Sequence, residues 1–169
     1  MPKDGMDTHS FAPDAETQRA FRDALGRFAT GVTVITTRYQ GQDVGITANS
    51  FAALSLDPAL VLWSPGRFSR RFAAFTECTH FAIHVLGADQ RDLAQHFVAH
   101  AQDFDLPGVT RGMGDVALLP DTLSRFECQM HARHPGGDHD IVVGQVLRVT
   151  TRPGAALGFF AGQYATIGG

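Results

Sequence analysis

The chain has 169 residues, of which 44% are hydrophobic and 18% charged, and its formal net charge at pH 7 is -3. This composition is typical of a globular protein with one core. Nucleic acids and anionic membranes usually bind a basic face, so the acidic balance argues against either as the main partner. No apolar run has the length of a membrane span and no signal-peptide pattern is present, so we expect a cytoplasmic protein.

Cysteine and lysine usage narrows the possible chemistry. Cys78 and Cys128 lie far apart and belong to no paired motif, so they indicate neither a zinc site nor a disulfide framework. Lys3 is the only lysine, which argues against a Walker-type phosphate loop and against a lysine Schiff base. Positive charge must therefore come from the arginines and from protonated histidines.

The chain is predicted to begin with a tail and a helix. Residues 1–13 mix Pro, Gly, Asp and Ser without periodicity, so we expect a disordered tail ahead of a single domain over residues 14–169. Asp14 can cap a helix that carries three large apolar side chains on one face, Phe21, Leu25 and Phe28.

The most informative stretch, residues 44–64, follows a strand predicted over residues 31–37 and a turn over 39–43. Two apolar runs flank small residues that supply hydroxyls, an amide and an uncrowded backbone, namely Gly45, Thr47, Ala48, Asn49 and Ser50. Such residues suit a polar, planar ligand held against main-chain N–H groups. Asp57-Pro58 then interrupts the run, so the stretch predicts a strand, a tight turn and a strand.

After Pro65-Gly66, a basic segment follows over residues 67–75, where phenylalanines recur at helical spacing. Ser69, Arg70 and Arg71 would lie in the first turn of this helix. Exposed N–H groups and cationic side chains at such a place suit an anion, so we predict a phosphate site there. The alternative is a solvated basic face on an amphipathic helix, and the neighbouring polar patch favours the phosphate site.

The remaining chain predicts mostly strands. Alternation predicts a strand over residues 80–86, helical spacing predicts a helix over 90–101, and residues 102–121 predict a long surface loop. Further strands are predicted over residues 126–133, 140–149 and 157–167. With six or seven strands, a few short helices and no βαβ rhythm, the fold is predicted to be mainly β, an antiparallel, Greek-key-like barrel with peripheral helices.

Two motif matches are rejected. Residues 112–117 match the letters of the dinucleotide fingerprint, but they follow a loop rather than a strand. His96 and His100 have the spacing of zinc proteases, yet Phe97 stands where those enzymes need a glutamate. We therefore predict no metal site.

His139 is the strongest candidate for a reactive side chain. It follows Gly136-Gly137-Asp138, where two glycines let the backbone turn or approach a ligand, and it lies where a strand leaves its turn. The residues alone support two readings equally, a histidine that faces a ligand and one that only hydrogen-bonds the loop.

Together these segments resemble the short-chain flavin reductases of two-component monooxygenases, which share the FMN-binding split-barrel fold. The matching segments are residues 28–36, Gly45-Ile-Thr-Ala-Asn-Ser-Phe51 with residues 55–58, Gly137-Asp-His139 with Gly144, and Gly162-Gln-Tyr164. They recur in order and span about residues 20–166. The resemblance implies a homodimer that transfers hydride from NADH or NADPH to FMN or FAD, with reduced flavin passed to a partner monooxygenase.

The resemblance also implies roles for individual residues. The flavin ring and its ribityl chain would be held by Thr47, Ala48, Asn49, Ser50 and Phe51. The flavin phosphate would be held by Ser64, Ser69, Arg70 and Arg71. His139 and Tyr164 would face the nicotinamide. The cofactors supply the electronics of hydride transfer, so no side-chain nucleophile is needed.

Three functions follow. The first is an NAD(P)H:flavin oxidoreductase, the second a tightly flavin-bound reductase of another acceptor, and the third a non-catalytic flavin- or haem-binding split barrel, because a fold alone does not fix a function. The Gly-Asp-His turn favours the first two, since a binding protein has no need for a histidine facing nicotinamide. The sequence leaves open FMN or FAD, and NADH or NADPH.

Overall fold

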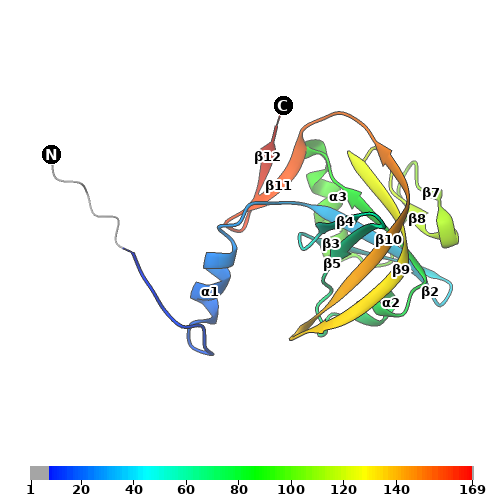
Figure 1. Cartoon of the computed structure of the whole chain (residues 1–169). Helices are drawn as coiled ribbons and strands as arrows, with labels where there is room; N and C mark the ends of the chain where they lie inside the picture. The colour runs from blue at the N-terminus through cyan, green and yellow to red at the C-terminus, as the bar shows by residue number, and fades with distance from the viewer. Residues whose placement is uncertain (1–7, 169) are drawn as a thin grey trace.

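The computed structural model describes residues 8–168 of the chain (Figure 1). The tail predicted over residues 1–13 lies partly outside these residues, and residues 8–13 form neither helix nor strand. The predicted domain boundaries stay a prediction.

The helix α1 (Gln18–Leu25) begins later than its predicted cap. Asp14 Oδ1 accepts hydrogen bonds from the backbone N–H groups of Glu16 and Thr17, both at 2.9 Å, so Asp14 fixes the turn that precedes the helix. None of the residues of α1 is buried, and Figure 1 shows the helix projecting from the body of the fold.

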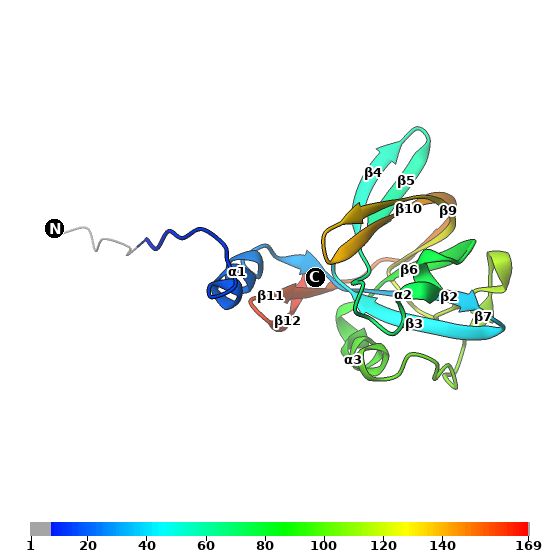
Figure 2. The ribbon, with the colours of Figure 1, turned by 90° about the horizontal axis from the view of Figure 1, so that it is seen from below.

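The body is a seven-stranded sheet in which all neighbouring strands are antiparallel. Its order is β3-β2-β6-β9-β10-β5-β4, and it curls in barrel-like fashion (Figure 2). The strand bounds are β2 (Thr33–Tyr39), β3 (Gln42–Ala48), β4 (Ala52–Leu56), β5 (Ala59–Trp63), β6 (His80–Val85), β9 (Ser124–Gly136) and β10 (His139–Thr151). The predicted fold class, mainly antiparallel β with few helices, is confirmed.

Smaller elements surround this sheet. A three-stranded sheet joins β1 (Thr30–Gly31), β11 (Ala156–Phe160) and β12 (Gln163–Ile167), and a two-stranded sheet joins β7 (Thr110–Arg111) and β8 (Ala117–Leu118). The other helical segments are α2 (Phe72–Thr76), α3 (Arg91–Ala99) and the 3-10 turns η1 (Ala88–Gln90) and η2 (Met113–Asp115).

Two cores lie on opposite faces of β2. Ile35 belongs to the inner core with Trp63, Phe75 and Phe81, whereas Val34 belongs to the outer core under α3. Successive side chains of a strand point to opposite faces, so a strand covered on both sides is apolar without alternation. This explains why residues 32–37 are all β-branched and all buried.

The structure corrects four predicted elements. Residues 44–64 form three strands, because the chain turns after Ala48 as well as at Asp57-Pro58. Residues 157–167 form the β11–β12 hairpin around Ala161 and Gly162, whose φ values are 48° and 79°. The helix predicted over 67–75 is limited to α2, which begins at Phe72. The predicted surface loop 102–121 contains η2 and two short strands, and it buries its residues 116–119.

Among residues 8–168, no helix combines the length and the apolar character needed to cross a bilayer.

Candidate functional site

A cavity of about 170 Å³ lies where β3 ends. Thr47, Ala48 and Asn49 line it, and Phe159 and Tyr164 line it from the C-terminal hairpin, with Val32 and Val98 completing the wall. The small side chains at the end of β3 leave room for this space. The fold therefore brings three of the predicted flavin-binding residues together with Tyr164. We call this space the β3-end cavity.

The ring of Tyr164 is held from two sides. The Phe159 ring packs edge-on, with ring centroids 5.4 Å apart, and Arg91 Cζ lies 5.3 Å from the centroid of the Tyr164 ring. Edge-to-face and cation–π contacts both favour a defined ring orientation. Tyr164 is thus a pre-oriented aromatic wall of the β3-end cavity.

Some hydrogen-bonding groups of the β3-end cavity bond within the protein, and others are available to a ligand. Thr47 Oγ1 donates to the Ala94 carbonyl of α3 at 2.6 Å, and Thr33 Oγ1 donates to the Ala48 carbonyl at 2.7 Å. Asn49 is exposed, and within residues 8–168 its side-chain amide makes no hydrogen bond. The Asn49 amide is therefore available to a ligand, while the Thr47 hydroxyl already holds α3.

The turn that follows β3 is connected to the seven-stranded sheet by Ser50, Phe51 and Ser64. Ser50 Oγ accepts a hydrogen bond from the Ser64 backbone N–H at 3.0 Å. The Phe51 side chain packs against the inner core and lies 5.6 Å from the Phe126 ring, centroid to centroid. The Phe51 side chain thus packs with the inner core, while the Phe51 backbone lies next to the turn that follows β3.

His139 is the first residue of β10, after a turn in which Gly137 has a φ of 73°. Its Nδ1 lies 2.7 Å from Asp138 Oδ1, and 49% of its side chain is exposed. The hydrogen bond from His139, followed by its charge when protonated, lowers the pKa of the Asp138 carboxyl. With Nδ1 engaged, Nε2 is the ring nitrogen left to meet a ligand.

A buried carboxylate anchors the histidine turn. Asp140 is 2% exposed and pairs with Arg67 Nε at 2.7 Å and with Arg133 Nε at 2.9 Å. Backbone hydrogen bonds add to this, because Asp140 N–H donates to the Pro65 carbonyl and Arg67 N–H donates to the Asp138 carbonyl. The turn is therefore fixed to the segment that follows β5.

His139 is linked to the predicted flavin residues through the segment 64–66. Ser64 is bonded to Ser50, and Gly66 forms an antiparallel bridge with His139. The β3-end cavity is not lined by His139, however. Within one chain, Asn49 shares a cavity with Tyr164 but not with His139.

The predicted phosphate residues precede α2 instead of lying in its first turn, because α2 begins at Phe72. Ser69 Oγ accepts from the Arg71 backbone N–H at 3.1 Å. The Arg71 guanidinium donates to the carbonyls of Phe97 and Val98 at the end of α3. Partial burial, followed by the charge of Arg70, lowers the pKa of Arg71. Arg71 is thus engaged with α3, and Arg70 is left for an anion.

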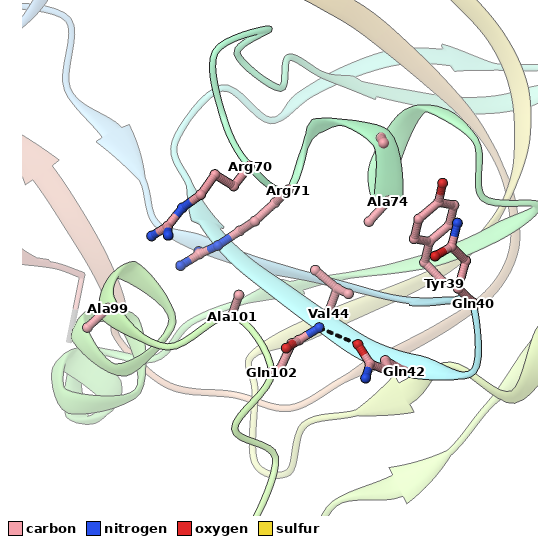
Figure 3. Close-up of a pocket in the computed structure, with 11 residues that line it drawn as sticks. Tyr39, Gln40, Gln42, Val44, Arg70, Arg71, Ala74, Ala99, Ala101 and Gln102 are labelled. Atoms are coloured by element: carbon pink, nitrogen blue, oxygen red, sulfur yellow. Dashed lines mark hydrogen bonds between the residues drawn. The ribbon is translucent and has the colours of Figure 1, made fainter.

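Arg70 and Arg71 also line a second cavity of about 610 Å³, which we call the arginine–glutamine cavity (Figure 3). It lies between α2, β3 and residues 99–102. Tyr39, Gln42 and Gln102 line it as well, and the sequence analysis did not select them. These residues come from separate segments without any motif, so only the tertiary structure identifies them.

Across residues 8–168, no group of three or more His, Cys, Asp or Glu side chains is arranged to hold a metal ion. His96 Nε2 instead lies 2.8 Å from the Asp103 carbonyl oxygen, and the His96 ring is tilted by 43° to the His100 ring, with centroids 5.2 Å apart.

Comparison with known proteins agrees with the resemblance. The family model described as flavin reductase like domain matches residues 25–168. FMN reductase (NADH) SmoA of Agrobacterium fabrum is 49% identical over 156 residues, which cover 92% of this chain and 90% of SmoA. The flavin-dependent monooxygenase reductase subunit HsaB of Rhodococcus jostii is 37% identical over 159 residues, covering 92% of this chain and 81% of HsaB.

A solved structure is similar over nearly its whole length. It is the NADH:FAD oxidoreductase SgcE6 of Streptomyces globisporus in complex with NAD and FAD fragments, with a TM-score of 0.84 and 33% sequence identity. The match covers 92% of this chain and 96% of that chain.

Proposed function

This chain belongs to the flavin reductase-like domain family, and we infer from this membership that it is an NADH-dependent flavin reductase supplying reduced flavin to a separate monooxygenase. The names of its relatives support this inference: SmoA is an FMN reductase that uses NADH, and HsaB is the reductase subunit of a flavin-dependent monooxygenase. The structural observation that carries the proposal is the β3-end cavity, where Asn49 and Tyr164 face the same space.

The residues of the β3-end cavity fit a flavin ring. Bound flavin accepts the hydride, so the protein has only to bind, orient and shield the reacting rings. Asn49 offers an amide to the polar edge of the ring, while Val32 and Phe159 give apolar walls that exclude water. The backbone N–H groups of residues 48–51 would face the bound ring and could stabilise negative charge there.

His139 and Arg70 complete the proposed site. The Nδ1 hydrogen bond to Asp138 sets the orientation of the His139 ring and directs Nε2 toward the nicotinamide. Arg70 binds the flavin phosphate, because Arg71 already donates to the carbonyls of α3. Ser69 shapes the turn that carries both arginines.

The functional form is a homodimer. The β3-end cavity, at about 170 Å³, is smaller than the roughly 300–1,000 Å³ typical of complete small-molecule sites, so a second copy would supply a missing wall. The exposed apolar face of α1 supports the same proposal, because large contiguous apolar surfaces commonly mark interfaces. Such a dimer would also allow His139 of one copy to approach Asn49 of the other. The cytoplasmic location stays a prediction.

Steady-state NADH oxidation tests the proposal. We expect the dialysed protein to oxidise NADH slowly until FMN or FAD is added, because the cavity offers neutral donors and no covalent attachment point. The His139→Ala variant should raise the apparent KM for NADH about threefold to tenfold, as for one lost hydrogen bond, and leave the flavin Kd unchanged.

Two results would favour the other candidate functions. A protein that keeps stoichiometric flavin through dialysis and ignores added flavin would be a tightly flavin-bound reductase of another acceptor. A protein that binds flavin but never oxidises NADH would be a non-catalytic binder. Equal loss of NADH and flavin affinity in His139→Ala would make the histidine structural.

A further inference from the structure

The arginine–glutamine cavity has a chemistry distinct from that of the β3-end cavity. Its volume of about 610 Å³ lies within the roughly 300–1,000 Å³ range of small-molecule sites. Figure 3 shows Arg70 and Arg71 at one end and Tyr39 at the other, with Gln42 and Gln102 along one side. Positive charge at one end and amides with an aromatic ring at the other suit a phosphorylated nucleoside.

The two glutamines form a paired amide. Gln102 Nε2 donates to Gln42 Oε1 at 2.6 Å, shown as the dashed line in Figure 3. Within the described part of the chain, neither side chain makes another hydrogen bond. The carbonyl oxygen of Gln102 and the NH₂ group of Gln42 are therefore left for a ligand. An acceptor and a donor are what adenine needs for its amino group and a ring nitrogen, the pairing that amide side chains make with this base.

Tyr39 gives this end of the cavity a fixed aromatic wall. Its hydroxyl donates to Glu77 Oε2 at 2.6 Å, and its ring packs against the inner core. A ring held in this way offers a stacking surface to a base without losing side-chain freedom on binding.

The two cavities adjoin along the edge strand β3. Thr47 lines the β3-end cavity on the α3 side, and Val44, which belongs to the inner core, lines the arginine–glutamine cavity. The two side chains point to opposite faces of this edge strand and lie about 10 Å apart along it, so a ligand joining the cavities would pass round its edge. On α3 the step is a single residue, from Val98 to Ala99, and Arg71 binds the Val98 carbonyl at this junction. A ligand of dinucleotide length that starts in one cavity and passes the arginines thus reaches the other.

We propose that the arginine–glutamine cavity binds the adenosine half of FAD, so that this reductase binds FAD more tightly than FMN. The proposal rests on the proposed function, because it requires the flavin ring in the β3-end cavity and a flavin phosphate at Arg70. FMN ends at that phosphate and leaves the amide pair without a partner. An adenosine phosphate is also one end of NADH, so the experiment must separate these two dinucleotides.

Calorimetric titration of the dialysed full-length protein with FAD, FMN and AMP as separate probes tests this proposal. Gln102→Ala removes one base-binding group and should raise the FAD Kd about threefold to tenfold, as for one lost hydrogen bond, with the FMN Kd unchanged. Gln95→Ala is the matched control, an exposed glutamine on α3 that lines neither cavity. Arg70→Ala should weaken FAD and FMN alike. AMP should compete with FAD.

Several outcomes overturn the proposal. If Gln102→Ala weakens the binding of FAD and FMN equally, or weakens neither, the cavity is not an adenosine site. A rise confined to the KM for NADH would assign the cavity to the nicotinamide dinucleotide instead. Wild-type protein that binds neither flavin would overturn the proposed function itself. Tight flavin binding that the Gln102 substitution does not change would overturn only the adenosine site.

Discussion

At the scale of single residues, Thr47 and Asn49, two positions apart at the end of β3, have different roles. The Thr47 hydroxyl is used inside the protein, where it donates to Ala94 of α3, whereas the exposed Asn49 amide is available to a ligand. Both are polar and close in sequence, and the family resemblance implied that both hold the flavin. Only the hydrogen-bond partner in the structure distinguishes a residue that holds the cavity wall in place from one that can bind a ligand.

We expect Thr47→Val and Asn49→Ala to separate stability from binding. Thr47→Val loses the hydrogen bond to Ala94 and should lower the free energy of unfolding by about 1 kcal/mol. Asn49→Ala should leave that free energy unchanged and raise the flavin Kd about threefold to tenfold. Urea unfolding and flavin titration of both variants measure this, and unchanged flavin binding in Asn49→Ala would remove Asn49 from the site.

His84 is a buried histidine that works as a neutral structural group. Nε2 accepts a hydrogen bond from the Leu119 backbone N–H at 3.1 Å, so Nδ1 carries the proton and donates to the Val34 carbonyl at 3.0 Å. Burial, outweighing the bond to Val34, lowers the pKa of His84 from 6.5 to about 3. His84 thereby joins β2 to the buried segment at residues 116–119.

The low pKa of His84 predicts acid sensitivity. The unfolded chain takes up this proton near pH 6.5 and the folded chain only near pH 3. The stability contribution is therefore complete above pH 6.5 and is lost as the pH falls toward 3, at about 1.4 kcal/mol per pH unit. Between pH 6.5 and 5, wild type should lose about 2 kcal/mol more than His84→Gln. Urea unfolding at both pH values tests this, and parallel losses would exclude His84 as the cause.

At the scale of elements, the packing of α3 on β3 shapes both cavities. A Cβ atom on Gly45 would lie 2.5 Å from the ring of Phe97, which is completely buried. The sequence analysis placed Gly45 beside a ligand, but its missing side chain makes room for Phe97. The same interface carries the Thr47 bond to Ala94 and the Gly45 N–H bond to the Ala101 carbonyl at 2.7 Å.

Gly45→Ala should therefore destabilise the fold, since the new methyl group must displace a buried ring. Overpacking of this kind costs about 1–3 kcal/mol of unfolding free energy. Gly31→Ala in β1 is the matched control, because a Cβ there meets nothing within 4 Å. Thermal or urea unfolding of both variants measures the difference, and equal stabilities would contradict the assigned role of Gly45.

At the scale of the whole molecule, three large apolar side chains in α1 and just after it are exposed. Figure 1 shows α1 projecting on the side of β11 and β12. The side chains of Phe21, Leu25 and Phe28 are 42%, 58% and 78% exposed. The sequence predicted that these three residues share a helical face, but α1 ends at Leu25, so Phe28 lies just beyond the helix. Within the described chain none of the three side chains is buried. A second copy is the occupant consistent with a β3-end cavity too small for a whole flavin.

A double substitution tests the homodimer. Leu25→Ser with Phe28→Ser should convert a dimer into a monomer and weaken flavin binding, because the second copy supplies one wall of the site. Met113→Ser between β7 and β8, an exposed apolar residue far from α1, is the control and should stay dimeric. Light scattering coupled to size exclusion measures the mass. A wild type that is monomeric at micromolar concentration would overturn the homodimer.

The sequence alone determined the mainly antiparallel β architecture, because hydrophobic periodicity and turn residues act over short distances along the chain. It also identified residues 47–51 and the turn before His139 as candidate parts of the site. Small residues and paired glycines have this value because they act on the backbone next to them. A Cβ atom on Gly112 would lie 2.5 Å from a Glu127 oxygen, so packing accounts for this glycine of the rejected fingerprint match.

Only the tertiary structure decided which polar groups are available to a ligand and which residues share a cavity. Thr47 is engaged with α3, Arg71 is engaged with the end of the same helix, and Gln42 meets Gln102 from sixty residues away. These pairings depend on how strands and helices pack across the sheet. Packing joins residues that no local pattern connects, which is why sequence spacing could not reveal them.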